Sequence, residues 1–267
     1  MTQHPGGKSS PKVAPTAASQ AAPSPTTITV MSFNIHHGQG TDGVLDLERI
    51  ARVIRTSGTD IAGLQEVDRH FAERSNWADQ AAELAELLHW HVAYGANIDL
   101  NPPAPGRPRI QFGNAVLSRY PITRRENTHL FRSPGEEQRG LLHGEVDVPG
   151  FPLHVYVTHL DAFSETDRVQ QAQQVVELMG ENCPAVLLGD FNAPPEAPEI
   201  GGLRAALTDT WTAAAGGGPH TVHPADAPAV RIDYIFTSQR LRAAWTSFST
   251  DEPAASDHVP VVSRLVA

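Results

Sequence analysis

Carboxylate, amide and imidazole side chains stand at the ends of several apolar runs in this sequence. The stretch LLGDFNAPP, residues 187–195, puts an acid and an amide directly after an apolar run and before two prolines. The same pattern recurs along the chain, at Asn34, Glu66, His159, Asp190 with Asn192, Asp233, and Asp257 with His258. Charged groups on buried strands destabilise a fold unless they are paired or bind a metal. Because a hard divalent cation such as Mg²⁺ relieves the repulsion between converging carboxylates, the pattern predicts a site for a metal and a phosphate.

Each of these residues also has a structural interpretation, which is the commoner one for a lone residue. Asp190 and Asn192 are typical of turns, since their side chains bond nearby backbone groups and readily precede proline. Glu66 is consistent with a surface acid paired with Arg69, and His159 with a core histidine bonded to a carbonyl group. Only their position after apolar runs favours chemistry, so both interpretations stay open for each residue.

Three other features do not indicate a nucleophile or a further ligand. The run Ser256–His258 has the residue types of a serine triad, but consecutive residues cannot adopt triad geometry, so an Asp-His loop pair is predicted instead. His36 and His37 stand in an HHG sequence that is typical of a polar turn. Cys183, the one cysteine, is interpreted as a small core hydrophobe and not as a nucleophile.

Short apolar runs alternate with helical patterns in the sequence, which indicates a mixed α/β layered domain. Strands are predicted at 28–35, 60–66, 110–118, 139–148, 152–160 and 185–188, and near 231–236 and 258–266. Helices are predicted from the Asp46 cap to Gly58, from Trp77 to His89, and from a Ser164/Asp167 capping box with Val169, Ala172, Val176 and Met179 on one face. The proline-rich stretch 101–108 and the glycine-rich stretch 213–220 are predicted loops.

Length and composition predict one globular domain. A chain of 267 residues with 40% hydrophobic content can bury one substantial core. Residues 1–27 are rich in Pro, Ala and Ser and predict a disordered tail, which leaves residues 28–267 as the folded domain. No apolar run approaches the roughly 20 residues of a membrane span, and no signal peptide core precedes the domain. The expected location is cytoplasmic.

The charge balance disfavours a duplex-binding surface. Two of the 20 basic residues are Lys8 and Lys12 in the predicted tail, so the domain holds 18 arginines, no lysine and 30 acids. Proteins that bind duplexes usually cluster basic residues, because neutralising phosphates supplies most of the affinity. This charge balance weakens the case for a nucleic-acid substrate without excluding one.

Seven segments, in order, resemble the endonuclease/exonuclease/phosphatase superfamily, which contains pancreatic deoxyribonuclease, abasic-site endonucleases, neutral sphingomyelinases and inositol polyphosphate 5-phosphatases. They are SFNIHHG, GLQEVD, FGNAVLSRYP, YVTHLDAF, LLGDFNAPP, RIDYIF and SDHVPV, and they cover about residues 28–265. The resemblance implies a four-layered α/β sandwich, in which two central, mostly antiparallel β-sheets are flanked by helices. It also implies a site at one edge of the sheets, where the strand ends meet.

The resemblance assigns roles to individual positions. Metal binding is implied for Asn34, Glu66 and Asp257. Asp190 and Asn192 resemble the pair that activates and positions the attacking water. The other catalytic positions implied are His159, and His258 oriented by Asp233. Substrate contacts are expected at Asn114, Arg139 and Arg168, although an ion pair with Glu136 or Glu137 is an equal alternative for Arg139.

These roles suit the hydrolysis of a phosphate ester. A phosphodiester repels hydroxide, so cleavage needs cationic or hydrogen-bonding groups around the phosphoryl oxygens and an activated water. A histidine paired with a carboxylate stays protonated to higher pH and can supply such a contact. The expected activity is a Mg²⁺- or Mn²⁺-dependent phosphoester hydrolase in which water attacks phosphorus directly.

The sequence separates the substrate classes only in part. The THL segment with His159 resembles the phosphodiesterase and phosphatase branches more than the abasic-site repair enzymes. A small phosphodiester or phosphomonoester, or a lipid head group, is therefore the expected substrate. The alternatives are an endonuclease that cleaves DNA or RNA with the same chemistry, and a non-catalytic binding module with the same fold.

Overall fold

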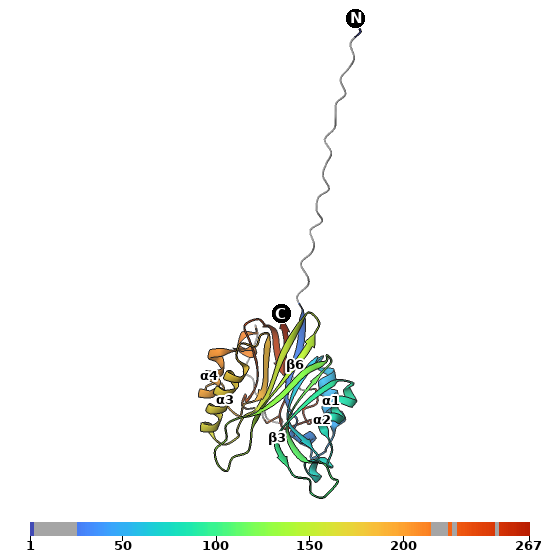
Figure 1. Ribbon diagram of the computed structural model, residues 1–267, viewed down its shortest axis with the longest axis vertical. Coiled ribbons are helices and arrows are strands. Elements are labelled where there is room, and N and C mark those ends of the chain that lie inside the picture. Colours follow the sequence, from blue (N-terminus) through green and yellow to red (C-terminus); the bar gives the residue numbers. More distant parts are fainter. Residues whose placement is uncertain (3–25, 215–223, 226–228, 249–250) are drawn as a thin grey trace.

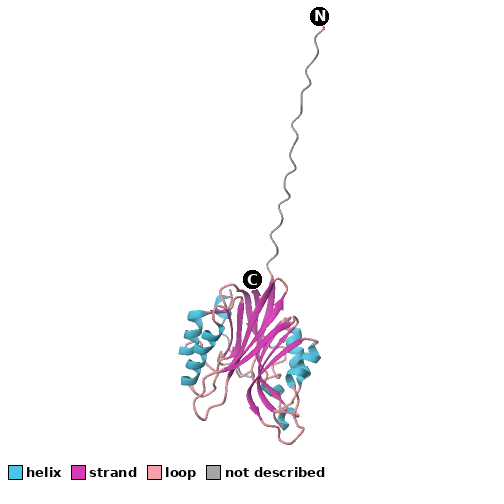
Figure 2. Cartoon of the chain, in the orientation of Figure 1, coloured by secondary structure: helices cyan, strands magenta, loops and turns pink. Residues whose placement is uncertain are grey.

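Two six-stranded β-sheets pack face to face at the centre of the computed structural model, and helices cover the outer face of each sheet (Figures 1 and 2). The structure describes residues 1–2, 26–214, 224–225, 229–248 and 251–267. Most of the predicted tail, 1–27, and most of the predicted glycine-rich loop, 213–220, lie outside these residues. The four layers confirm the predicted α/β sandwich.

The first sheet has the strand order β11-β12-β1-β2-β4-β3. Its strands are β1 (Thr27–Asn34), β2 (Ile61–Arg69), β3 (His91–Leu100), β4 (Ile110–Ser118), β11 (Arg242–Phe248) and β12 (Val261–Val266). Only the pair β1 and β2 is parallel, and the other neighbours are antiparallel. The sheet is covered by helices α1 (Leu47–Thr56) and α2 (Gln80–Leu88), which appear on the right in Figure 1.

The second sheet has the strand order β5-β6-β7-β8-β10-β9. Its strands are β5 (Ile122–His129), β6 (Gly140–Val148), β7 (Phe151–His159), β8 (Ala185–Asp190), β9 (Thr208–Asp209) and β10 (Asp233–Thr237). Here β7 and β8 form the one parallel pair among antiparallel neighbours. Helices α3 (Glu165–Met179) and α4 (Pro198–Ala206) cover it, and the short helix α5 (Thr210–Ala213) follows β9.

The core between the sheets is tightly packed. Val157 and Leu188 of the second sheet contribute to a buried cluster with Ile61 of the first. A Cβ atom at Gly63 would lie 2.8 Å from side-chain atoms of both Val157 and Leu188. Glycine at this position of β2 therefore lets the two sheets approach closely, as dense interior packing requires.

The predicted helix caps are present, whereas helix and strand bounds differ in places. Asp46 accepts the backbone N–H of Arg49 at 2.8 Å, and Ser164 accepts that of Asp167 at 3.2 Å. The second helix begins at Gln80, three residues after the predicted start, because Asp79 caps it. Within the described part of the chain, none of the helices is both long enough and apolar enough to cross a bilayer.

The predicted apolar face of α3 is confirmed at Ala172 and Met179, which are buried, and Val176 packs partly buried against the same core. Val169 is instead 38% exposed, and the helix also buries Val175 and two polar residues. One of these, Gln171, accepts the backbone N–H of Asp161 at 2.9 Å. A polar side chain with a specific backbone partner thus takes a position that hydrophobic periodicity assigns to solvent.

Candidate active site

The strand ends that carry polar residues meet at one edge of the two sheets. In the parallel pair of the second sheet, His159 of β7 lies opposite Asp190 of β8. Asp190 is in turn opposite Asp233 of β10, which runs antiparallel to β8. In the first sheet, Asn34 ends β1 opposite Gln65, next to Glu66. Parallel strands end at the same edge, so the topology gathers residues that are far apart in the sequence.

A cavity of about 380 Å³ lies at these strand ends, although Asn34 and Asp233 are not part of its lining. Its lining includes Glu66, Arg139, His159, Asp190, Asn192, Asp257 and His258. A larger hollow of about 520 Å³ lies by α1 and α2, but none of the strand-end residues lines it. The smaller cavity is the candidate active site because the ionisable groups converge there.

Asn34 joins the two sheets within the site. Its Nδ2 donates to Glu66 Oε1 at 3.0 Å and to Asp190 Oδ2 at 3.1 Å. The side chain is itself fixed, because Asn34 Oδ1 accepts the backbone N–H of His36 at 3.0 Å. One amide therefore holds two carboxylates from different sheets at a set separation.

Two of the site residues have left-handed backbone conformations. Glu66 has a φ of 57° and lies where the pairing of β2 with β4 shifts register between Leu64 and Val67. Asn192 has a φ of 49°, and its backbone N–H donates to Asp190 Oδ1 at 3.0 Å. Such conformations are costly for residues with a side chain, and they concentrate at functional sites.

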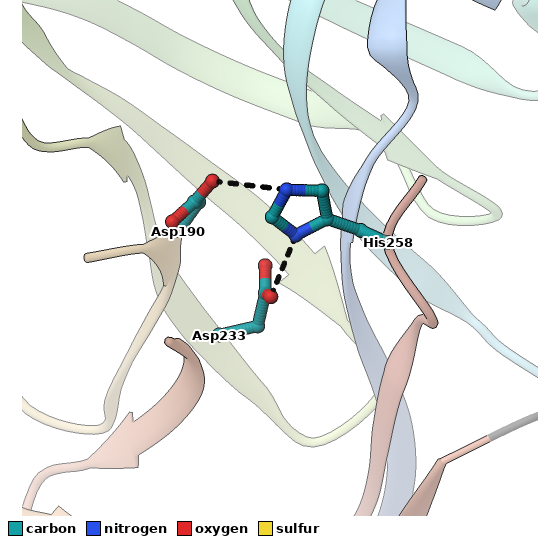
Figure 3. A group of neighbouring side chains, drawn as sticks. All are labelled: Asp190, Asp233 and His258. Atoms are coloured by element: carbon teal, nitrogen blue, oxygen red, sulfur yellow. Dashed lines mark hydrogen bonds and ion pairs between the residues drawn. The ribbon is translucent and has the colours of Figure 1, made fainter. Parts of the chain in front are cut away.

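His258 connects two buried carboxylates (Figure 3). Its Nδ1 lies 2.8 Å from Asp233 Oδ2, and its Nε2 lies 3.6 Å from Asp190 Oδ2. Burial lowers the pKa of His258, but the charges of Asp233 and Asp190 outweigh it, so the net effect raises that pKa. The imidazole is therefore protonated at neutral pH and places a positive charge beside Asp190.

His159 has the opposite protonation state. Burial and then the charge of Arg139 lower the pKa of His159 to about 3, although Asp190 opposes the shift. In agreement with a neutral ring, Asn192 Nδ2 donates to His159 Nε2 at 3.0 Å. The two histidines on either side of Asp190 therefore differ in charge.

The pKa of His159 predicts a pH-dependent stability. The ring is neutral in the folded state, and an unfolded histidine titrates near pH 6.5, so its contribution is complete above that value and is lost as pH falls toward about 3. When the pH is lowered from about 8 to about 5, the free energy of unfolding of the wild type should fall by about 2 kcal/mol more than that of His159→Gln. Urea unfolding of both proteins in EDTA measures this difference, and equal pH dependence would contradict it.

Two sets of side chains have the chemistry of metal ligands. Ligand atoms of Asp190, Asp233 and His258 lie within 4.8 Å of one another. That set is already hydrogen bonded, and a protonated imidazole has no lone pair for a cation. Glu66 and Asp257 both line the cavity, and burial, with added repulsion from Asp190 and Asp257, raises the pKa of Glu66. Since a cation relieves this repulsion, the Glu66 side of the cavity fits a divalent metal better.

The residues expected to contact substrate differ in whether they line the cavity. Arg139 is buried and lines the cavity, and its Nη1 lies 3.0 Å from Glu137 Oε1, so both sequence interpretations describe part of its environment. Arg168 lies outside the cavity lining, where its Nε donates to Glu199 at 2.5 Å. Arg168 thus pairs with a buried carboxylate outside the lining, and contact with substrate at this residue stays a prediction.

Asn114 also lies outside the cavity lining. Its Nδ2 donates to the carbonyl groups of Gly140 and Val157, at 3.3 and 3.5 Å, so it links β4 to the opposite sheet. These contacts give Asn114 a role in holding the sheets together, and contact with substrate at this residue stays a prediction. The sequence motif around it did not reveal which way the side chain points.

The contacts of Glu66, of His36 and His37, and of Cys183 bear on the structural interpretations of these residues. Arg69 pairs with Asp79 and not with Glu66, so Glu66 is free of the surface ion pair. His36 and His37 form a short 3₁₀ turn, as a polar turn predicts, and neither lines the cavity. Cys183 is only partly buried, and its Sγ lies 3.2 Å from Ser238 Oγ, so the core interpretation was incomplete.

Phe71, Arg74 and Phe112 line the cavity and were not predicted from the sequence. No motif or strand-end pattern marks Phe71 or Arg74, and Phe112 begins the FGNAVLSRYP segment without being singled out as a site residue. Spatial proximity to Glu66 is the only signal that identifies them.

A two-sheet α/β sandwich with carboxylates, amides and histidines gathered at the strand ends is a fold of the phosphoester hydrolase type. Residues 31–258 match the Endonuclease/Exonuclease/phosphatase family, and the chain belongs to that family. It is 30% identical to the uncharacterized protein YbhP of Escherichia coli K12 over 250 residues. This match covers 88% of this chain and 95% of YbhP.

Solved structures agree with this assignment. The endonuclease/exonuclease/phosphatase from Beutenbergia cavernae is 30% identical and has a TM-score of 0.80, over 90% of this chain and 71% of that one. The mannosyl-6-phosphatase Bt3783 of Bacteroides thetaiotaomicron is 22% identical with a TM-score of 0.71, over 90% of this chain and 100% of that one. The second likeness extends to the fold alone.

Proposed function

We propose that this protein is a Mg²⁺- or Mn²⁺-dependent phosphoester hydrolase that acts on a small phosphomonoester or phosphodiester, or on a lipid head group. The observation that carries the proposal is the position of Asp190, a buried carboxylate held between the protonated His258 and the neutral His159. Such a carboxylate can hold and deprotonate a water molecule while a neighbouring cation binds the phosphoryl oxygens.

Each residue of the site has one task in this reaction. Asp190 accepts the proton of the attacking water, and Asn192, fixed by its bond to the Leu160 carbonyl at 3.0 Å, orients that water. His258, held by Asp233, donates from Nε2 to a phosphoryl oxygen. His159 lines the same cavity and shapes the position of Asn192 through their hydrogen bond.

Glu66 and Asp257, with Asn34 beside them, would hold the metal ion. When bound, a divalent cation neutralises charge on the phosphoryl group and on the departing oxygen. Arg139, with a buried Nε that has no partner among the described residues, adds a second cation on the His159 side of the cavity. The site is thereby matched to an anionic ester.

A substrate panel tests the proposal. We expect EDTA-sensitive release of p-nitrophenol from bis(p-nitrophenyl) phosphate or p-nitrophenyl phosphate in Mg²⁺ or Mn²⁺, and no nicking of supercoiled plasmid under the same conditions. Plasmid nicking that EDTA abolishes would instead favour the endonuclease. Hydrolysis that continues unchanged in EDTA would contradict the metal dependence.

The endonuclease remains the second candidate because it would use the same chemistry. The formal charge of the chain is −10, and a surface of this sign disfavours a polyanionic duplex. We therefore favour a compact substrate that enters the cavity over a polymer that lies across the surface.

A further inference from the structure

Arg74 brings a guanidinium group into the cavity that contains Glu66. Its Nη2 donates to Asp68 Oδ1 at 2.8 Å and its Nε donates to Asp68 Oδ2 at 3.0 Å. The side chain of Asp68 is 0% exposed, whereas that of Arg74 is 39% exposed. The buried carboxylate therefore anchors one edge of the guanidinium and leaves the other edge accessible.

Two aromatic rings fix the same guanidinium from a second direction. Arg74 Cζ lies 5.0 Å from the ring centroid of Phe71 and 5.6 Å from that of Phe112. Both rings also line the cavity. A guanidinium that is bound at one edge and stacked on rings loses little further freedom when it binds an anion, so the position is preorganised for one.

The accessible edge of Arg74 has unused donors. Within the described ranges, Arg74 Nη1 makes no hydrogen bond, while Nε and Nη2 bond to Asp68. A purely structural partner for Asp68 would not need to face the cavity. Arg69, five residues earlier, shows that arrangement: it pairs with Asp79 and lies over the ring of Tyr94, but it does not line the cavity.

The reacting phosphate in the proposed function is already matched by other groups. His258 and Arg139 provide positive charge on the side of Asp190 and His159, and the metal would lie at Glu66 and Asp257. Arg74 is thus a further cation in the cavity, close enough to Glu66 for the two charges to interact, and Asp68 and the two rings fix its position. Its free donors suit an oxyanion on another part of the substrate.

We propose that Arg74 binds a second phosphate, carried by the alcohol part of the substrate, and that the protein therefore prefers bisphosphates to monophosphates. This inference rests on the proposed function, since the second phosphate is defined relative to the one that reacts. Asp68, Phe71 and Phe112 act as positioning residues for the guanidinium. The preference should appear mainly in KM, because the contact is present in both the bound substrate and the transition state.

The test compares α,ω-alkanediol bisphosphates, with spacers of two to six carbons, with the corresponding monophosphates in Mn²⁺. We expect the wild type to show, at one spacer length, a kcat/KM for the bisphosphate about tenfold above that for the monophosphate, after correction for its two equivalent phosphates. The series of spacers is needed because the second phosphate must reach Arg74 while the first one reacts.

The substitutions are chosen to preserve the fold. Arg74→Gln alone would leave Asp68 buried and unpaired, so the decisive variant is the double substitution Asp68→Asn with Arg74→Gln. The bisphosphate preference should fall about tenfold in this variant and remain in the control Arg69→Gln. A preference that survives the double substitution, or no preference at any spacer length, would overturn the inference.

Binding separates this inference from the proposed function. The same compounds are titrated calorimetrically into Asp190→Asn protein in Mn²⁺, where affinity does not depend on turnover. Tighter binding of a bisphosphate that requires Arg74, in a protein whose wild type hydrolyses neither compound, would support the inference and contradict the proposed function. Hydrolysis by the wild type without any Arg74-dependent preference would support the proposed function and contradict the inference about Arg74.

Discussion

Asp190→Asn should lower kcat/KM for a phosphoester by roughly 10²- to 10⁴-fold, which is the range for loss of a general base. Asparagine has nearly the same shape, and its side-chain oxygen can still accept from Asn34, which donates to Asp190 at 3.1 Å. It cannot take the proton of the attacking water, because it lacks the negative charge. Release of p-nitrophenol in Mn²⁺ measures the rate, and thermal unfolding measures the stability.

A matched control for this variant is Glu126→Gln, which removes an exposed carboxylate paired with Arg124 at 3.1 Å on β5. The control should change neither the rate nor the unfolding midpoint appreciably, because exposed ion pairs contribute about 0–1 kcal/mol. Full activity in Asp190→Asn would exclude Asp190 as the base. Loss of activity together with an equal loss of stability would support the turn-capping interpretation instead.

Glu66→Gln is expected to weaken Mn²⁺ binding by at least about 10- to 100-fold, the scale found for changes around metal ligands. Glutamine keeps an acceptor for Asn34 Nδ2, but it does not supply the charge that the cation needs. In the wild type, Mn²⁺ at about 100 times its Kd should stabilise the fold by about 2.7 kcal/mol, and the variant should show little of this gain. Titration calorimetry and thermal unfolding of EDTA-stripped protein measure both effects.

A second substitution distinguishes the two sets of metal ligands. Asp233→Asn should leave Mn²⁺ affinity close to that of the wild type if the cation lies at Glu66 and Asp257. If Asp190, Asp233 and His258 hold the cation, Asp233→Asn should abolish binding, and Glu66→Gln should have a small effect. Asp99→Asn, at an exposed carboxylate paired with Arg109, is the control for general loss of negative charge.

The polar residues at the strand ends could be predicted from the sequence, because each of them lies next to its strand in the chain. Each apolar run and the polar residue that ends it are adjacent in the chain, so the run at 185–188 was enough to single out Asp190. The structure adds what the sequence could not, which is that Asn34 bonds to both Glu66 and Asp190. The contact between Asn34 and Asp190 joins residues of different sheets and depends on how the sheets pack.

Side-chain direction is what the sequence motifs could not predict. Asn114 lies in a segment that resembles the family and Arg168 follows one, yet Glu199 pairs with Arg168, and carbonyl groups of the opposite sheet hold Asn114. In the same way, Arg74 enters the cavity only because Asp68 and two rings orient it. A motif gives the identity of a residue and its place in the chain, but not its partners.

The sequence by itself determined the layered α/β class, the caps of α1 and α3, and the residue types that could bind a metal and a phosphate, because each depends on neighbouring residues in the chain. Only the tertiary structure decided the protonation states of His159 and His258. The two histidines have the same intrinsic pKa and similar burial, and they differ because Arg139 lies near one and Asp233 is bonded to the other. Charge at this site is therefore a property of packing, since the electrostatic neighbours of each ring come from distant parts of the chain.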